Sequence, residues 1–296
     1  MQAVADDDDF LALGGESLMA VQLISRVRDS TGSGIAVAEF TAAPTFGRLV
    51  ELVGHRTSAA DPGIPGVVRL RAAESGRPLF LAADAMGSAA SYRVLAELMD
   101  VGRPIVGLEP AGLHRGIAEL ARAHVQALLR VQPDGPYTVG GWSFGAIVAH
   151  EMAAQLIRRG ASVDRLVCLD GYVPERRGRL RFRIANARLQ AQAALGSGPV
   201  GRALRGDPAA RRAFVANIGA ALRYRARPVA CPMALFTAGS ATAERLAQDL
   251  NGLYADIDVV AVEGDHWSML DRPHAEDLAR KVSVSLRCAP GTAEGR

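Results

Sequence analysis

The stretch that decides the fold is Gly141-Trp142-Ser143-Phe144-Gly145, which stands between a short apolar run, Tyr137–Val139, and a helical pattern that begins at Ala146. A serine in a G-x-S-x-G turn between a strand and a helix has a strained backbone, and its hydroxyl is exposed above the carboxyl edge of the sheet. The bare pattern is not rare in a chain with 31 glycines, so the strand–turn–helix context is what predicts a nucleophile. The alternative is a small-residue turn that only lets the helix pack closely.

The alternation of strand and helix continues on both sides of this turn. Short apolar runs predict strands at Val67–Leu70, Leu79–Ala83, Ile105–Leu108, Tyr137–Val139, Leu166–Leu169, Met233–Phe236 and Val259–Val262. Amphipathic spacing predicts helices at Tyr92–Met99, Ile117–Val131, Ala146–Arg158 and Ala243–Leu250. Continuous apolar strands that alternate with helices indicate an α/β fold with a mostly parallel sheet covered on both faces. Residues 175–227 show helical fragments and no strand pattern, and this segment is too long for an ordinary connection.

Composition excludes several classes of protein. With 296 residues and 49% hydrophobic side chains, the chain can form one large domain or a large and a small one. A formal net charge of +3 is nearly balanced and argues against a nucleic-acid partner. The cysteines, Cys168, Cys231 and Cys288, have no C-x-x-C spacing, which favours a reducing, cytoplasmic compartment over a disulfide framework or a zinc site. The chain shows neither a membrane-spanning apolar run nor a signal-peptide pattern, so no membrane partner is expected.

A serine hydroxyl is a weak nucleophile unless a base accepts its proton, and that base needs an acid to orient it. Asp170 directly follows a predicted strand, so its side chain and that of Ser143 should emerge at the same edge of a parallel sheet. His266 follows the last predicted strand and completes the chain order serine, acid, histidine. We therefore predict a catalytic triad. Asp265 and Asp271 are competing acids, and a lone aspartate at a strand end is also a common turn or helix cap.

Two backbone N–H groups should stabilise the negative charge that develops on the substrate oxygen. One belongs to Phe144, the residue after the predicted nucleophile, and the other lies in the loop Asp84–Gly87 that follows an early strand. We assign the second N–H to Ala85. The predicted chemistry needs no metal and no dissociable cofactor, because proton transfer and oxyanion stabilisation suffice.

The chain divides into two unequal parts. Residues 1–54 show helical spacing of apolar side chains, which predicts a small all-α domain. Residues 55–66 contain Ser, Pro and Gly without a periodic apolar face and are predicted to be a linker. Residues 67–288 form the α/β domain, and residues 289–296 are expected to be a flexible tail.

A family resemblance rests on three pieces of the α/β domain. These pieces are Gly141-Trp-Ser-Phe-Gly145, Leu166-Val-Cys-Leu-Asp170-Gly-Tyr and Gly264-Asp-His-Trp-Ser-Met-Leu270. They resemble the thioesterase domains that end nonribosomal peptide synthetases and polyketide synthases, which are members of the α/β-hydrolase superfamily. The resemblance implies that residues 175–227 form a helical lid over an acyl-binding cavity. Where that family often has His-Pro-Ala-Gly-Gly, this chain has Ala83-Asp-Ala-Met-Gly87, with the loop length kept.

A second resemblance lies upstream of the linker. The run Asp8-Asp-Phe-Leu-Ala-Leu-Gly-Gly-Glu-Ser-Leu18, followed by Val21-Gln-Leu and Ala43-Pro-Thr45, is similar to a peptidyl carrier protein. In that family the serine of this run carries 4′-phosphopantetheine, so the resemblance implies attachment at Ser17. A whole carrier has one more helix before this run. We therefore expect residues 1–54 to be a truncated carrier at the end of a longer polypeptide.

Together the two resemblances imply a release enzyme of an assembly line. An acyl or peptidyl chain would move from the carrier to Ser143 and leave by hydrolysis or macrocyclisation, with upstream synthetase modules as partners and a carrier-bound peptidyl or polyketide thioester as substrate. Two alternatives stay open. One is an editing thioesterase that clears misacylated carriers, and the other is a non-catalytic carrier or docking module on a hydrolase scaffold.

Overall fold

The computed structural model describes most of the α/β domain and part of the N-terminal region. The described residues are 5–15, 19–20, 23–24, 27, 35, 37–41, 43–57, 64–73, 75–110, 112, 114–171, 187–189, 191–195, 200, 204, 208–239, 250 and 252–287. Several predicted features lie outside them: Ser17, Cys288, residues 175–186 of the predicted lid, nearly all of the helix predicted at Ala243–Leu250, and the tail 289–296. The chain divides into two compact units, Met1–Pro62 and Gly63–Arg296.

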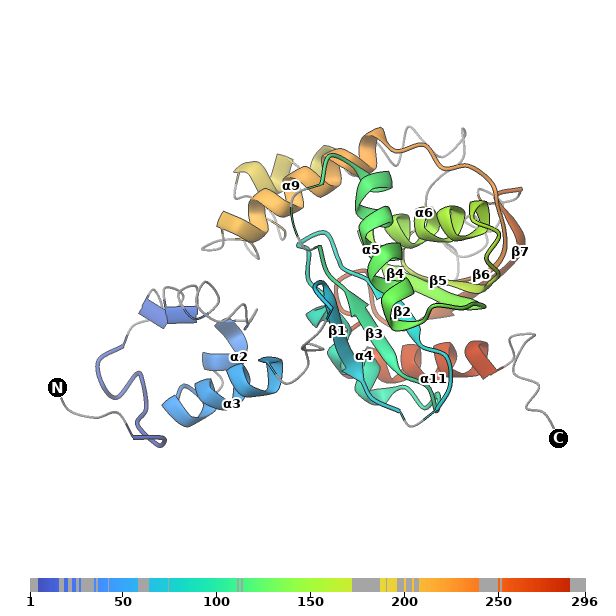
Figure 1. The fold of residues 1–296 in the computed structure, drawn as a ribbon. Helices are drawn as coiled ribbons and strands as arrows, with labels where there is room; N and C mark the ends of the chain where they lie inside the picture. Colours follow the sequence, from blue (N-terminus) through green and yellow to red (C-terminus); the bar gives the residue numbers. More distant parts are fainter. Residues whose placement is uncertain are drawn as a thin grey trace. The chain divides into compact units, whose positions relative to one another are not determined.

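The first unit is built from helices around a small apolar core. Its described helices include α2, Val37–Thr41, and α3, Phe46–Thr57 (Figure 1). The buried side chains of this core are those of Ala20, Ile24, Ile35, Phe40, Leu49 and Leu52. Helix α3 ends at Thr57, three residues inside the linker predicted at residues 55–66, so the linker begins later than predicted. The helix-breaking pair Pro62-Gly63 follows only after α3 has ended.

The second unit is organised around a seven-stranded sheet. Its strands are β1 Val67–Arg71, β2 Leu79–Ala82, β3 Ile105–Leu108, β4 Tyr137–Trp142, β5 Val163–Leu169, β6 Val229–Ala238 and β7 Tyr254–Val262. The strand order is β1-β3-β2-β4-β5-β6-β7. Only the pair β1 and β3 is antiparallel, so the predicted α/β class with a mostly parallel sheet is confirmed.

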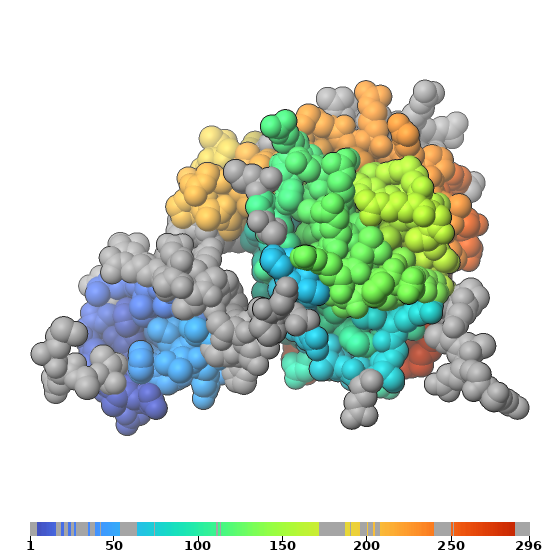
Figure 2. Space-filling model, in the orientation of Figure 1, coloured from blue at the N-terminus to red at the C-terminus, as the bar shows by residue number. Residues whose placement is uncertain are grey.

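Helices cover both faces of this sheet (Figure 1). The described helices are α4 Arg93–Leu98 (after a short 3₁₀ turn at Ala90–Tyr92), α5 Ile117–Val131, α6 Phe144–Arg158, α9 Pro208–Arg223 and α11 His274–Arg287. Helices α5, α6 and α9 share one apolar cluster with Phe80 of β2, whereas α4 and α11 share another with Leu79 and Leu81. In Figure 2 the green atoms of α5 and the yellow-green atoms of α6 lie on the visible face of this unit. Alternate residues of β2 thus face opposite helical layers, as the pleat requires.

Helix α9 is the longest described piece of the segment predicted as a lid. Its buried side chains, Phe214, Ile218 and Ala221, join the cluster of α5 and α6. Between β5 and β6 the described residues include helical pieces at 187–189 and 191–195 and no strand. The described part of this insertion is therefore helical, and its role as a lid stays a prediction.

A buried histidine joins α6 to the chain that follows α9. Nδ1 of His150 lies 2.7 Å from the hydroxyl of Tyr254, and Nε2 lies 3.1 Å from the carbonyl oxygen of Arg227. A carbonyl can only accept, so Nε2 carries the proton and Nδ1 accepts from the tyrosine. His150 is 1% exposed, and this burial lowers its pKa from 6.5 to about 4.

This histidine should make the folded protein sensitive to acid. Below pH 6.5 the unfolded chain binds a proton at His150 that the folded chain does not bind until about pH 4, so stability falls as the pH decreases across that window. The expected loss is about 3 kcal/mol. His150→Gln keeps one donor and one acceptor without titrating. Urea unfolding between pH 7 and 4 should therefore show a smaller decline for this variant, and parallel curves would contradict the prediction.

Candidate active site

The turn between β4 and α6 holds Ser143 in a strained conformation. Its φ and ψ are 54° and −113°, in a region that side-chain-bearing residues rarely adopt. Space is equally restricted beside it. A Cβ on Gly141 would lie 2.8 Å from the nitrogen of Ala146, and one on Gly145 would lie 2.9 Å from the hydroxyl of Tyr92. The close approach of strand and helix thus explains both glycines of the G-x-S-x-G turn.

Tyr92 ties this turn to the neighbouring strand. Its hydroxyl donates to the carbonyl oxygen of Ala82 at the end of β2, at 2.7 Å, and accepts from the N–H of Trp142, at 2.8 Å. The side chain is fully buried, and burial raises the pKa of its hydroxyl well above 10. No sequence pattern singles out this residue, because an aromatic side chain at the start of a predicted helix resembles any other core residue.

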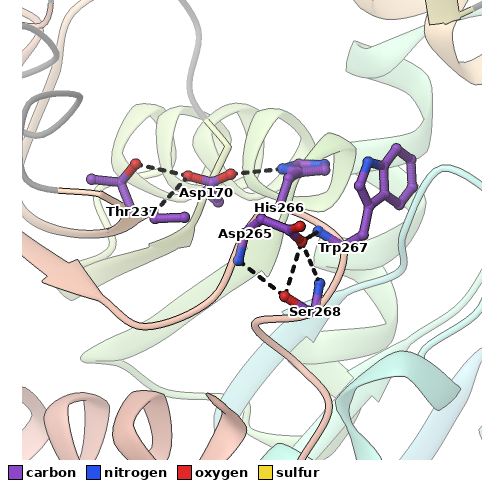
Figure 3. A network of polar contacts seen from close by, with 7 residues as sticks. Asp170, Thr237, Asp265, His266, Trp267 and Ser268 are labelled. Atoms are coloured by element: carbon purple, nitrogen blue, oxygen red, sulfur yellow. Dashed lines mark hydrogen bonds and ion pairs between the residues drawn. The ribbon is translucent and has the colours of Figure 1, made fainter.

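Asp170 lies directly after β5, and two donors hold its side chain from one side. The Thr237 hydroxyl donates to Oδ1 at 2.7 Å, and the backbone N–H of Ala238 donates to the same oxygen at 3.2 Å (Figure 3). Burial alone would raise the pKa of Asp170, but hydrogen bonds from His266 and Thr237 outweigh it and lower the pKa below its ordinary value. Asp170 therefore stays a carboxylate. The signal that could have found Thr237 is its place immediately after a predicted strand.

The imidazole of His266 contacts the other oxygen of this carboxylate. Nδ1 of His266 lies 2.7 Å from Oδ2 of Asp170, as Figure 3 shows. Because a carboxylate only accepts, Nδ1 carries the proton and Nε2 is free to accept one. Trp142 stacks on the imidazole at a centroid distance of 5.1 Å, and Trp267 meets it edge-on at 5.1 Å. Two predicted site residues that are 96 positions apart are thus brought together.

The competing acid Asp265 organises the histidine loop instead of contacting the imidazole. Its Oδ1 accepts from the N–H groups of Trp267 and Ser268 and from the Ser268 hydroxyl, each at 2.9 Å (Figure 3). Hydrogen bonds from the Ser268 N–H and hydroxyl, followed by that from Trp267, lower the pKa of this exposed carboxyl. Among the described residues, Asp170 is the acid that bonds His266, and neither Asp265 nor Asp271 does so.

Ser143 directly follows β4, which pairs with β5, the strand that precedes Asp170. The N–H of Ser143 donates to the carbonyl oxygen of Leu169, the residue before Asp170, at 2.9 Å. The ring of Trp142, the residue before Ser143, is the one that stacks on His266. Among the hydrogen bonds of the described residues, none joins the Ser143 hydroxyl to the imidazole. Such contacts are often long without substrate and tighten in the reacting complex.

The loop after β2 places Ala85 and Asp84 in different environments. The carboxylate of Asp84 is buried and accepts from the N–H groups of Met86, at 2.9 Å, and Ser88, at 3.2 Å. Burial raises the pKa of Asp84 to about 6, although these two hydrogen bonds lower it in part. The N–H of Ala85 meets no acceptor among the described residues, and the N–H of Phe144 opens α6, where helix geometry leaves it unpaired.

Gly171 allows the chain after Asp170 to pass the serine turn. A Cβ on Gly171 would collide with the Ser143 carbonyl oxygen and lie 2.7 Å from its Cα and N. Backbone atoms of a strained turn have little room to move. Gly171→Ala should therefore reduce the free energy of unfolding by about 3 kcal/mol, as overpacking in a tight interior does. Gly116→Ala is the matched control, because a Cβ there meets nothing within 4 Å, and it should shift the urea midpoint little. Equal midpoints for the two variants would contradict the prediction.

No group of three or more His, Cys, Asp or Glu side chains in the described part of the chain could hold a metal ion. No helix among those residues is long and apolar enough to cross a membrane. Cys168 and Cys231 are free and buried.

The sheet topology, the strained serine turn and the Asp170–His266 pair at one sheet edge define the class of an α/β hydrolase. The family model "Thioesterase domain" matches residues 77–286, and the chain therefore belongs to the thioesterase domain family. The model "Phosphopantetheine attachment site" matches residues 1–53, which identifies the N-terminal region as a carrier region. The predicted order of carrier and thioesterase regions is thus confirmed.

Curated relatives are large synthetases. A dimodular nonribosomal peptide synthase of Bacillus subtilis is 37% identical over 177 residues, which cover 57% of this chain and 7% of the relative. Enterobactin synthase component F of Escherichia coli O157:H7 is 32% identical over 176 residues, which cover 57% of this chain and 14% of the relative. The chain thus spans only a small share of the length of these relatives.

Solved structures show the same architecture. A crystal structure of a holo four-domain nonribosomal peptide synthetase bound to AMP and glycine has 25% identity and a TM-score of 0.61, and the match covers 95% of this chain and 24% of that one. The thioesterase domain of NocB, in covalent complex with a fluorophosphonate nocardicin G analogue, has 24% identity and a TM-score of 0.57, covering 72% of this chain and 95% of that one. The second likeness supports the fold alone.

Proposed function

We propose that this protein is a serine thioesterase that releases an acyl or peptidyl chain from a phosphopantetheine carrier, with Ser143, Asp170 and His266 as its catalytic triad. The observation that carries the proposal is the 2.7 Å hydrogen bond between Asp170 and His266 beside a serine at φ 54°. A carboxylate that orients an imidazole next to a strained serine turn is the arrangement that activates a hydroxyl. Membership in the thioesterase domain family supports a thioester as the bond attacked.

In the first half of the reaction, Oγ of Ser143 attacks the thioester carbonyl carbon while Nε2 of His266 takes the hydroxyl proton. Asp170 keeps the second proton on Nδ1 and stabilises the imidazolium that forms. When the tetrahedral intermediate collapses, the carbon–sulfur bond breaks and the proton on Nε2 goes to the departing sulfur. The products of this half are an ester on Ser143 and a free thiol.

The second half repeats these proton transfers with a new nucleophile. His266 takes a proton from water, or from an amine or hydroxyl of the bound chain, as that group attacks the ester. The proton then returns to Oγ of Ser143 as the chain leaves as an acid or a ring. In both halves the N–H groups of Ala85 and Phe144 are proposed to stabilise the oxyanion. Removing one such donor typically costs about 3 kcal/mol of transition-state stabilisation.

The carrier region is proposed to bring the substrate to this site. A serine hydroxyl is the group that forms a phosphodiester with phosphopantetheine, and Ser17 stands within the matched residues 1–53. The group on Ser17 would supply the thiol that holds the acyl chain. Upstream synthetase modules are the proposed partners, since the relatives are multidomain synthetases.

The test is to trap the ester on the wild-type chain. Incubation with acyl thioesters of N-acetylcysteamine should release free thiol and increase the intact mass by one acyl group. Proteolytic mapping should place that group on the peptide that contains Ser143. Thiol release that persists at the wild-type rate in Ser143→Ala would overturn the covalent mechanism. A chain that neither releases thiol nor gains mass would favour a non-catalytic scaffold.

A further inference from the structure

A side chain from α9 reaches the loop that holds Ala85. Nδ2 of Asn217 donates to the carbonyl oxygen of Ala85 at 2.9 Å, across 132 positions of the chain. Asn217 lies on the described helix of the segment predicted as a lid, and the loop follows β2 at the sheet edge. The contact is partly buried. It therefore links the lid segment directly to the proposed oxyanion hole.

The two peptide groups that flank Ala85 are both held by hydrogen bonds. In the peptide before it, the carbonyl oxygen of Asp84 accepts from the N–H of Gly87 at 3.0 Å. In the peptide after it, the N–H of Met86 donates to the Asp84 carboxylate at 2.9 Å, and the carbonyl oxygen of Ala85 accepts from Asn217. Peptide groups are planar, so fixing both of them fixes the direction of the Ala85 N–H. The two peptide groups contain two carbonyl oxygens and two N–H groups. Of these four, the Ala85 N–H is the one without a hydrogen-bond partner among the described residues.

Two of these three contacts come from the loop itself, and the third comes from α9. The position of α9 is set by the burial of Phe214 and Ile218, which flank Asn217 in the sequence and join the apolar cluster of α6. Helix α6 carries Phe144, the other proposed oxyanion donor. The N–H groups of Ala85 and Phe144 must converge on one substrate oxygen. Their positions therefore both depend on the packing of α9 against α6.

We propose that Asn217 is a positioning residue, which orients the Ala85 N–H and so makes the oxyanion hole depend on the position of α9. The inference rests on the proposed function, because an oxyanion hole exists only if Ser143 forms a tetrahedral intermediate. A lid that carries this amide sets the N–H direction when α9 is seated and releases the Ala85 carbonyl when α9 moves away. The substrate-covering element would thereby also control the catalytic power of the site.

The experiment compares two donor-deleting variants, Asn217→Leu and Asn217→Asp, with a control on the same helix, Arg212→Ala. Arg212 is exposed and has no role in the site. With an N-acetylcysteamine thioester, both Asn217 variants should lower kcat by about 10- to 100-fold and change KM by less than about 3-fold, because the oxyanion forms only in the transition state. The control should match the wild type. A boronic acid that forms a tetrahedral adduct on Ser143 should bind both variants more weakly by a similar factor.

Two variants of Asn217 are used so that a folding defect in one of them does not decide the result. Leucine has the size of asparagine but is apolar, whereas aspartate keeps the polarity of a partly exposed side chain and loses the donor. If one of them fails to fold by circular dichroism, the other still tests the inference. Wild-type kcat and boronate affinity in a folded variant would overturn the positioning role, and so would a rise in KM at unchanged kcat. A wild-type chain that forms no acyl-enzyme would refute the proposed function instead.

Discussion

Replacing Asp170 by asparagine should lower kcat by about 10³- to 10⁴-fold without disturbing the fold. The reason is that Oδ1 of Asp170 already accepts two hydrogen bonds. Thr237 and Ala238 both donate to Oδ1, so an asparagine must place its amide oxygen there and turn its NH₂ group toward His266. The imidazole would then accept at Nδ1 and carry its proton on Nε2. In this tautomer Nε2 cannot take the proton of Ser143.

The measurement is single-turnover acylation at neutral pH, with Asp265→Asn as the matched control. Asp265 is the other acid beside His266, and its accepted hydrogen bonds all reach an oxygen that asparagine keeps. This control should stay within about 3-fold of the wild type, as expected for a group that makes no contact with the imidazole. A larger loss for Asp265→Asn than for Asp170→Asn would show that the acid has been assigned to the wrong residue.

Thr237→Val refines the same argument. It removes one of the two donors on Oδ1 and leaves the Ala238 N–H in place. Asp170 would still be held, so acylation should fall by about 10-fold or less, in line with the loss of one hydrogen bond to a charged group. The acylation rate of the Thr237 variant reports how much the orientation of the carboxylate matters. The further loss in the Asp170 variant reports the effect of the wrong imidazole tautomer.

Features that arise from local pattern could be predicted from the sequence. The helix at Ile117–Val131 and the strand at Ile105–Leu108 have the predicted bounds, because amphipathic spacing and a continuous apolar run each report burial directly. The order serine, acid, histidine also placed Asp170 near His266, since parallel strands end at a common edge. These inferences need only the chain direction of each element.

The bounds of an element were harder to predict where a residue type is compatible both with a strand and with a turn or break. The strand predicted at Tyr137–Val139 extends to Trp142, because Gly140 and Gly141 resemble a turn in the sequence yet pair with β5. The strand predicted at Met233–Phe236 runs from Val229 to Ala238, although Pro232 interrupts its apolar pattern. In both cases pairing with a neighbouring strand outweighs local propensity.

The contacts of the side chains that position the site could not be predicted, although Thr237 stands directly after a predicted strand. Tyr92 bridges two strand ends, Thr237 holds the acid, and Asn217 reaches the Ala85 carbonyl. These partners lie between 10 and 132 positions away, so no local pattern records the contacts. A tyrosine, a threonine or an asparagine in such places is also a common core, strand or helix residue. Positioning groups of this kind become visible only when tertiary contacts are known.

Replacing Ser143 should separate activity from stability. Ser143→Ala and Ser143→Gly both remove the hydroxyl, so neither should form the acyl-enzyme, and kcat should fall by roughly 10⁶-fold, as it does when a serine nucleophile is deleted. Adding Asp170→Asn to either variant should cost almost nothing further, because an imidazole without a hydroxyl partner has no proton to accept. A further large loss in the double variant would mean that Asp170 acts independently of the serine.

The two variants should nevertheless differ in unfolding. At φ 54° alanine keeps the clash of a Cβ with the backbone, which costs about 1–2 kcal/mol, whereas glycine removes the clash at a smaller entropic cost of about 0.5–1 kcal/mol. Urea unfolding should therefore show Ser143→Gly to be the more stable variant by up to about 1 kcal/mol. That result would identify the turn as a place where stability is sacrificed to expose a hydroxyl. If alanine proves as stable as glycine, the turn stores no strain, and the serine needs another reason for its conformation.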